Sequence, residues 1–346
     1  MKKVVSLVAV GSALLAGSLA SAASAETIPQ LEPTTQAFID KLTAAGGPPL
    51  YTMTPQAARK VLDDVQADPN GKLAPAHEKE VTLPVGPTGK TMVRVIRPAD
   101  VKGTTPVIMY FHGGGWILGN AATHDRLVRE LANRAHATVV FVEYEPSPEA
   151  QFPVAIEQDY AATKYVAEHP QEFDVDANRL ALAGDSVGGN MVAVVAQMAK
   201  ERHGPAIRFQ AMFYPVTDYT LDDSTYEAFP NGPWLTKPAM RWFWDAYLPN
   251  ATEAQANDPH VSPLRASLDA LKGLPPALVI TDENDVLRHE GEAYAHKLAQ
   301  AGVNVTAVRF LGTMHDFMML NPLRNTPAAL GATALAGSML DQALAK

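Results

Sequence analysis

The spacing of apolar residues divides this 346-residue chain into two kinds of segment. Before residue 81, Thr34 to Ala45 and Pro55 to Ala67 carry apolar residues at helical spacing, and Gly46-Gly47-Pro48-Pro49 separates them. This pattern predicts a helical hairpin. From residue 81 onward, short continuous apolar runs alternate with segments of helical periodicity. The alternation predicts an α/β fold with a mostly parallel central sheet and helices on both of its faces.

The predicted strands and helices fix the domain organisation. A hairpin is expected from the strands 81–85 and 92–97, and the later predicted strands are 106–111, 138–144, 179–183, 209–214, 276–281 and 305–310. The predicted helices between them are 126–134, 156–167, 191–202 and 290–301. Residues 216–274 interrupt the alternation with a proline-flanked aromatic cluster and are too long for an ordinary connection. We therefore expect an N-terminal helical segment (26–80), an α/β domain (81–215 and 275–346) and an insertion (216–274) lying over the carboxyl ends of the strands.

The first 25 residues have the composition of a secretory signal peptide. Lys2 and Lys3 precede an apolar stretch from Val4 to about Leu19, and Ala23-Ser24-Ala25 is a cleavage site of small residues before Glu26. The alternatives, a membrane anchor or a buried helix, fit less well because glycine and serine interrupt this short stretch. The expectation is an exported protein, periplasmic or extracellular, with no stable membrane insertion after cleavage.

Charge and cysteine content exclude several classes of function. Loss of Lys2 and Lys3 leaves 26 of the 28 basic side chains against 37 acidic ones, so the net charge changes from −9 to −11. Such an acidic surface argues against nucleic-acid and anionic-lipid partners. The sequence contains no cysteine, which removes thiol nucleophiles and the usual structural zinc sites.

The strongest candidate for chemistry is Ser186 in Gly184-Asp185-Ser186-Val187-Gly188. An apolar run ends at Gly184 and a helix-compatible segment follows, as in a nucleophile elbow, where a strained turn exposes the serine hydroxyl above a sheet. The pentapeptide alone is weak, since a glycine-rich turn carrying an ordinary serine has the same sequence. A base, an orienting acid and an oxyanion hole are needed to distinguish the two.

The chain offers candidates for each of these groups. His112-Gly113-Gly114-Gly115-Trp116 follows a predicted strand, and its glycines free backbone N–H groups to converge on an oxyanion. We expect His112 to brace this loop and not to act as a base. The candidate base is His315, just after the last predicted strand. For the acid, the residues leave Asp282, Glu283 and Asp285 as competitors.

Taken together, these motifs make the chain similar to the bacterial hormone-sensitive-lipase-like carboxylesterases of the α/β-hydrolase superfamily. The resemblance spans about residues 106–317 and is carried by HGGGW (112–116), GDSVGGN (184–190), DVL (285–287) and GTMHDF (312–317). It implies an α/β-hydrolase fold with a helical cap made from the N-terminal helices and the segment after Val216. It also implies Asp285 as the acid, in the chain order serine–aspartate–histidine, and chemistry without a metal or an organic cofactor. The sequence departs from the family pattern at three places. Val187 stands where the family has alanine, Val286 where it has proline, and Glu145-Pro146-Ser147 where it has arginine-leucine-alanine.

The resulting hypothesis is a serine carboxylesterase that hydrolyses short- to medium-chain esters through an acyl-enzyme. Ser186, Asp285 and His315 are the predicted catalytic residues, with the N–H groups of Gly113, Gly114 and Val187 as the oxyanion hole. The predicted substrate pocket consists of Trp116, Trp234, Met240 and Phe243, and Trp242 is a further candidate for the cap lining. The alternatives are a lactonase, an amidase, a deacetylase acting on acetylated sugars, and a small-molecule binding protein without turnover. The sequence leaves open whether the protein is a monomer or a dimer.

Overall fold

A single mixed sheet organises the molecule in the computed structural model, which describes residues 30–68 and 71–345. The predicted signal peptide lies outside these residues. The sheet has the strand order β1-β2-β4-β3-β5-β6-β7-β8. Strand β1 pairs antiparallel with β2, and β2 pairs antiparallel with β4. The strands that follow in this order, from β4 through β3 to β8, pair parallel with their neighbours. The strands are β1 (Ala76–Leu83), β2 (Thr91–Pro98), β3 (Thr105–Phe111), β4 (Thr138–Glu143), β5 (Val175–Asp185), β6 (Phe209–Phe213), β7 (Ala277–Asn284) and β8 (Val305–Met314).

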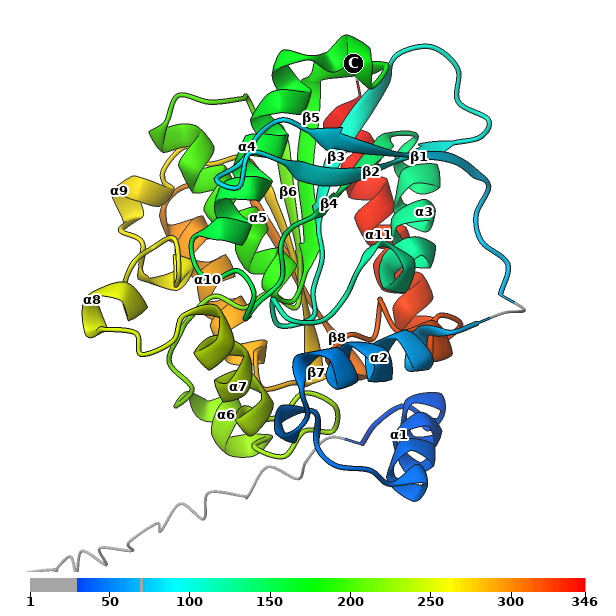
Figure 1. Ribbon diagram of the computed structural model, residues 1–346, viewed down its shortest axis with the longest axis vertical. Helices are drawn as coiled ribbons and strands as arrows, with labels where there is room; N and C mark the ends of the chain where they lie inside the picture. Colours follow the sequence, from blue (N-terminus) through cyan, green and yellow to red (C-terminus); the bar gives the residue numbers. More distant parts are fainter. Residues whose placement is uncertain (1–29, 69–70, 346) are drawn as a thin grey trace, which may run out of the picture.

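Helices cover both faces of this sheet. In Figure 1, α3 (Ala121–Ala135) and α11 (Pro327–Leu344) lie to one side of the strands, and α4 (Val154–Glu168), α5 (Val187–Glu201) and α10 (Arg288–Gln300) lie to the other. The central strands are buried on both faces, which is why they read as continuous apolar runs. The predicted α/β fold with a mostly parallel sheet is confirmed.

Strand β1 and helix α11 are two of the elements that differ from the prediction. Strand β1 begins at Ala76, five residues before the predicted start. Its first half could not be predicted, because it is exposed on both faces and its polar residues show no alternation. Helix α11 was not predicted. It is alanine-rich, it is capped by Thr326, whose hydroxyl accepts a hydrogen bond from the Ala329 N–H, and it packs against α3. Within the described residues, no helix combines the length and apolarity needed to cross a bilayer.

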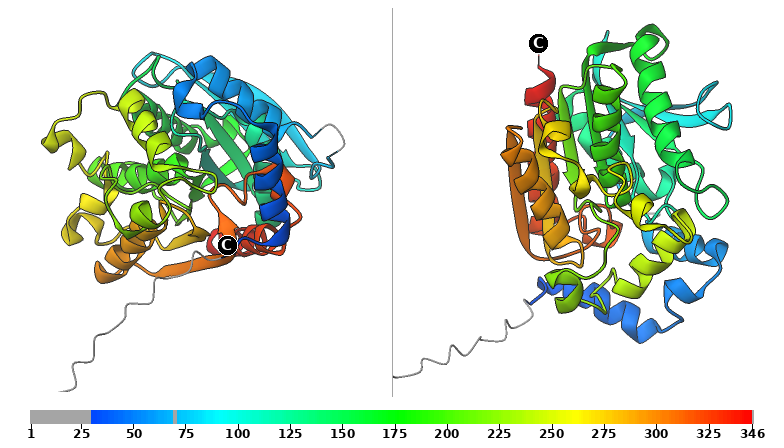
Figure 2. Two further views of the ribbon diagram at one scale, coloured as in Figure 1. Left: turned by 90° about the horizontal axis from the view of Figure 1, so that it is seen from below. Right: turned by 90° about the vertical axis from the view of Figure 1, so that its left-hand side faces the viewer.

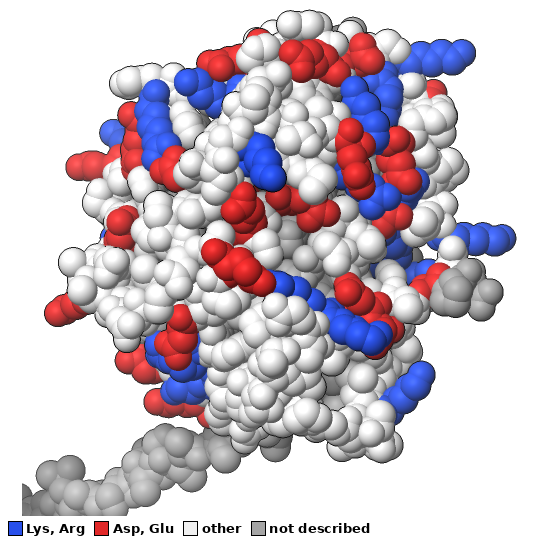
Figure 3. All heavy atoms as spheres, in the orientation of Figure 1, with Lys and Arg blue, Asp and Glu red and all other residues white. Residues whose placement is uncertain are grey.

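Short helices gather at the end of the molecule where the parallel strands terminate. They are α1 (Pro33–Ala45), α2 (Pro55–Gln66), α6 (Ser224–Ala228) and α7 (Lys237–Tyr247). Figure 2 (left) looks onto this end, with α1 and α2 in blue and the segment containing α6 and α7 in yellow-green. Charged side chains of both signs are interspersed over the face in Figure 3, and few of them lie in its lower central part.

The rest of the insertion takes a different course. Helices α8 (Glu253–Ala256) and α9 (Leu268–Leu271) lie at the side of the molecule in Figure 1. The α9 helix packs on α10, and the short turn Pro263–Arg265 packs on both α5 and α10. Only the first part of the insertion, with α6 and α7, therefore lies over the strand ends.

Candidate active site

Ser186 occupies a strained turn between β5 and α5. Its backbone has φ 55° and ψ −121°, a left-handed conformation that a residue with a side chain rarely adopts. Hydrogen bonds fix the turn: the Ser186 N–H donates to the Phe213 carbonyl at 2.8 Å, and the Val216 N–H donates to the Ser186 carbonyl at 3.1 Å. A Cβ at Gly188 would lie 2.0 Å from the Phe111 carbonyl oxygen, so glycine is required there. The surrounding structure thus holds the hydroxyl at the end of the central strand.

His315 and Asp285 lie beside this hydroxyl. His315 Nε2 is 2.9 Å from Ser186 Oγ, and His315 Nδ1 is 2.8 Å from Asp285 Oδ2. Because a carboxylate only accepts, Nδ1 carries a proton in the hydrogen bond to Asp285, and in the neutral form of the ring Nε2 accepts the serine hydroxyl. The other carboxylate oxygen of Asp285 accepts the Leu287 N–H at 3.1 Å. The three side chains form one chain of hydrogen bonds, and each is almost fully buried.

The structure distinguishes the three acidic candidates. Asp285 contacts the imidazole, whereas Glu283 accepts the Gly312 N–H at 2.7 Å and supports the end of β8. Asp282 is buried, and its oxygens accept no hydrogen bond from the described residues. Burial and the nearby charge of Asp285 raise the pKa of Asp282 well above its usual range. Position along the chain could not separate these residues, but the geometry does.

Opposing effects act on the protonation of His315. Burial disfavours its charged form, but the negative charges of Asp285 and Asp316, with the Asp285 hydrogen bond, outweigh burial and raise the pKa of His315 to about 9. Asp316 Oδ1 lies 3.6 Å from His315 Nε2, on the side that faces Ser186. No motif in the sequence singled out Asp316.

The glycine loop after β3 requires a correction to the predicted oxyanion hole. The Gly113 N–H donates to Asp185 Oδ1 at 3.2 Å and is therefore already used. Gly114 and Gly115 line the cavity at Ser186 instead, and their N–H groups donate to no atom of the described residues. Gly113 was thus wrongly assigned, because the sequence does not show which of three consecutive N–H groups turns inward. The N–H of Val187, in the first turn of α5, has no partner within the helix.

His112 braces this loop, as expected. Its Nδ1 is 2.8 Å from the Gly113 carbonyl oxygen, and its ring lies 4.2 Å from that of Tyr144 at an interplanar angle of 9°. Burial and the neighbouring His124 lower the pKa of His112 to about 3, so the ring stays neutral. The prediction that His112 supports the loop is confirmed.

Asp185 connects the loop to the elbow. It accepts hydrogen bonds from Tyr110 Oη at 2.7 Å and from the Gly113 N–H, and it lies 3.2 Å from His124 Nε2. Burial works against the charged forms of both Asp185 and His124, but their mutual attraction outweighs it, so the pKa of Asp185 is lowered and that of His124 raised. This buried pair joins β3, α3 and β5 directly beneath Ser186.

A cavity of about 270 Å³ opens beside Ser186 and His315. Trp234, Met240 and Phe243 line it, as predicted. Trp116 does not, and that prediction is wrong: its ring is fully buried and stacks on Tyr247 of α7 at 4.1 Å and an interplanar angle of 3°. Trp242 is likewise absent from the lining. The remaining apolar lining residues were not predicted; they are Leu42, Pro48, Pro49, Leu50, Val61, Leu62, Val65, Leu118, Leu235 and Ala239.

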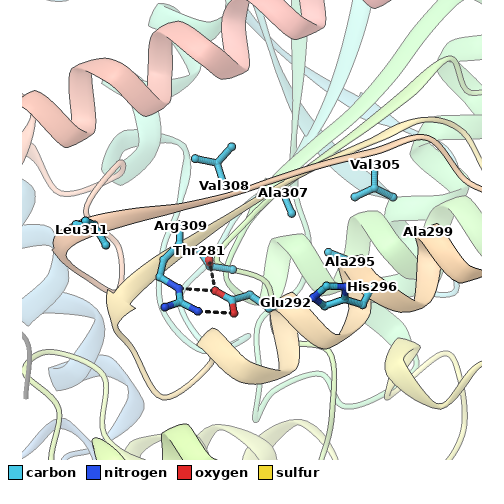
Figure 4. Close-up of a pocket in the computed structure, with 10 residues that line it drawn as sticks. All are labelled: Thr281, Glu292, Ala295, His296, Ala299, Val305, Ala307, Val308, Arg309 and Leu311. Atoms are coloured by element: carbon cyan, nitrogen blue, oxygen red, sulfur yellow. Dashed lines mark hydrogen bonds and ion pairs between the residues drawn. The ribbon is translucent and has the colours of Figure 1, made fainter. Parts of the chain in front are cut away.

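Another hollow lies on the sheet edge between α10 and β8. Figure 4 shows Glu292 reaching toward Arg309 and Thr281, and the Glu292 carboxylate accepts hydrogen bonds from the Arg309 guanidinium at 2.7 Å and from Thr281 Oγ1 at 3.0 Å. None of the predicted site residues lines it. Thr281, Glu292 and Arg309 pair with one another there.

Asp282, Asp285 and His315 are the described residues whose possible metal-ligand atoms lie close together, within 4.8 Å of one another. Two of the three already hydrogen-bond to each other, and His315 also faces Ser186. The donor set therefore suits orientation of an imidazole better than coordination of an ion.

The fold and this site define a class of protein: the chain belongs to the α/β-hydrolase-fold family, whose model matches residues 108–319. A thermostable esterase from Pseudomonas putida ECU1011 superposes with a TM-score of 0.89 and 50% identity, covering 92% of this chain and 99% of the other. Carboxylesterase NlhH of Mycobacterium tuberculosis is 37% identical over 73% of this chain and 78% of its own length. Ethyl acetate hydrolase of Pseudomonas putida is 33% identical over 80% of this chain and 86% of its own length.

Proposed function

We propose that this protein is a serine carboxylesterase. The observation that carries the proposal is the hydrogen-bonded chain from Ser186 through His315 to Asp285, which opens into a largely apolar cavity. The esterases that resemble the chain over most of its length support the same reaction class.

The mechanism follows from the positions of the protons. Ser186 Oγ attacks the ester carbonyl while His315 Nε2 takes its proton, and Asp285 stabilises the imidazolium that forms. His315 then returns that proton to the leaving alcohol. In the second half of the cycle, His315 takes a proton from water, the resulting hydroxide equivalent attacks the acyl carbonyl, and His315 gives the proton back to Ser186 Oγ as the acid leaves.

The oxyanion of the tetrahedral intermediate would be stabilised by N–H groups at the elbow. We assign this role to Gly114, Gly115 and Val187, because the first two line the cavity and the third begins the helix that follows Ser186. A helix N-terminus favours negative charge, and each such donor contributes a factor on the order of 10²–10³ in turnover.

The cavity supports a substrate with a small apolar acyl group. Its walls are mainly aliphatic and aromatic side chains, and its volume of about 270 Å³ suits short- to medium-chain esters. A relative is named ethyl acetate hydrolase, and a variant of the esterase rPPE has been crystallised with (S)-Ac-CPA. A lactone or an acetylated sugar would be cleaved by the same three residues.

Labelling by a fluorophosphonate tests the nucleophile. The wild-type protein should be labelled and should hydrolyse a short-chain activated ester, and Ser186→Ala should lose both properties. Ser338→Ala serves as the control, because Ser338 is exposed on α11. Labelling of Ser186→Ala at the wild-type level would place the nucleophile elsewhere. Rates on esters of increasing acyl length, with lactones and acetylated sugars in parallel, then define the substrate class.

We also propose that residues 1–25 direct export to the periplasm or beyond, and that residues 26–80 contribute to the cap together with the first part of 216–274. Helices α1 and α2 support the cap assignment, because Leu42, Leu62 and Val65 from them line the cavity at Ser186. Mass spectrometry of the mature protein from a bacterial host would identify the N-terminus, which is expected at Glu26.

A further inference from the structure

A second carboxylate lies next to the base, on the side away from Asp285. Asp316 Oδ1 is 3.6 Å from His315 Nε2, too far for a hydrogen bond but close enough for an ion pair. This oxygen is buried and accepts no hydrogen bond from the described residues. The side chain as a whole is 12% exposed and lines the cavity that contains Ser186. A buried, unpaired carboxylate oxygen is costly, which calls for an explanation.

The local structure holds Asp316 in this place. Its backbone has a φ of 67°, in the left-handed region, which turns the chain immediately after His315. Its other oxygen, Oδ2, accepts a hydrogen bond from Trp234 Nε1 at 2.9 Å. Trp234 belongs to the insertion, and its ring lies 5.8 Å from that of Phe38 on α1. Both parts of the cap therefore meet at the residue that positions this carboxylate.

We propose that Asp316 acts as a second counter-ion of the His315 imidazolium, opposite Asp285, and that Trp234 holds it in position. Asp316 does not take the proton. It stabilises the positive charge that His315 carries between proton uptake from Ser186 and proton release to the leaving group. This role rests on the proposed function, and it makes Asp316 a positioning residue that acts through His315.

The other charged and aromatic groups near His315 do not face its Nε2 atom as Asp316 does. Asp285 pairs with Nδ1, Asp185 at the end of β5 adds negative charge from further away, and the Tyr214 ring lies edge-on at 5.0 Å. Burial raises the pKa of Asp316, the facing His315 counteracts this rise, and Asp185 and His124 act at longer range. Asp316 is thus the carboxylate that faces Nε2, the nitrogen that exchanges the proton.

The test is the pH dependence of kcat/KM in Asp316→Asn. Asparagine matches the shape of aspartate, tolerates a left-handed φ, and its carbonyl oxygen can still accept the Trp234 N–H. Removing the charge should move the acidic limb of the profile to lower pH. For a unit charge at 3.6 Å, Coulomb's law with the dielectric constant of water gives a roughly sevenfold change in the protonation equilibrium as a lower bound. Asp245→Asn, on the exposed face of α7, is the matched control.

Two further measurements distinguish failure of this proposal from failure of the proposed esterase function. The proton on His315 Nδ1 can be followed by NMR, and its titration midpoint should fall in Asp316→Asn whether or not the protein hydrolyses esters. Trp234→Phe keeps the carboxylate but removes its hydrogen bond, and it should shift the acidic limb in the same direction by a smaller amount. An acidic limb and an NMR midpoint in Asp316→Asn that match those of Asp245→Asn would overturn the proposal. Failure of Ser186 labelling would instead overturn the esterase function.

Discussion

Replacement of Asp285 by asparagine tests the chain of hydrogen bonds most directly. Asparagine keeps the volume of the side chain but removes its negative charge, and its NH₂ group can donate to His315 Nδ1. Donation to Nδ1 favours the tautomer protonated at Nε2, which cannot accept the proton of Ser186. Asp285→Asn should therefore lose both the stabilisation of the imidazolium and the correct tautomer.

The size of the loss follows from the distance between the charges. At the 2.8 Å between Nδ1 and Oδ2, Coulomb's law gives about 1.5 kcal/mol with a dielectric constant near 80 and about 6 kcal/mol with one near 20. Because both side chains are buried, the upper part of this range applies, about 4–6 kcal/mol. That range corresponds to a decrease in turnover of about 10³–10⁴.

The assay is kcat/KM on a short-chain chromogenic ester at the pH of the wild-type plateau. Asp282→Asn is the matched control, since Asp282 is equally buried in the same segment and makes no hydrogen bond to the imidazole. Asp282→Asn should stay within about threefold of the wild type, with circular dichroism used to verify folding of both variants. An Asp285→Asn rate within tenfold of the wild type, or a larger loss in Asp282→Asn, would refute the assignment of the acid.

Three further predictions concern stability, turnover and substrate size. Burial raises the pKa of Asp159 well above its usual range, and its oxygens have no partner among the described residues. The folded state thus keeps a proton that the unfolded chain loses above about pH 3.9. The free energy of unfolding of the wild type therefore falls as pH rises from about 3.9 to the raised pKa of Asp159 in the folded state. In urea titrations, Asp159→Asn should match the wild type near pH 3.5 and gain relative stability toward neutral pH; a difference independent of pH would contradict this. Gly115→Ala would place a Cβ 2.0 Å from the Phe243 ring and should reduce kcat by about 10²–10³, whereas Gly302→Ala, also at positive φ but with free space around its Cβ, should not. Phe243→Ala should shift the ratio of kcat/KM toward octanoate over acetate esters, with Trp242→Ala as a control outside the cavity; equal ratios in the two variants would remove Phe243 from the acyl pocket.

The sequence was most informative about strands and least informative about side-chain direction. Buried parallel strands require continuous apolar runs, so the five strands from β3 to β7 were found close to their observed positions. The polar first half of β1 lies at the sheet edge and has no such requirement, so its start was misplaced. The N-terminal helices were predicted as helices, but their contribution of Leu42 and Leu62 to the cavity depends on tertiary packing.

The same limit applies at the site. Ser186 and His315 could be located because each follows a predicted strand. Position after the preceding strand left three acidic neighbours as candidates, and the family resemblance indicated Asp285 among them. The choices between Gly113 and Gly115, and between a lining and a packing role for Trp116, depend on the direction of single groups in a loop. Asp316 was passed over because a carboxylate next to a histidine has no distinctive pattern in sequence.

The stack of Trp116 on Tyr247 has a consequence for how substrate enters. Trp116 ends the oxyanion loop, its carbonyl accepts the Ser147 N–H at 2.8 Å, and the Tyr247 carbonyl accepts the Phe152 N–H at 2.8 Å. Displacing α7 by the width of a side chain would separate the rings and disturb the glycines that face Ser186. Helix α7 is therefore a fixed part of the cavity wall and does not move aside to admit substrate.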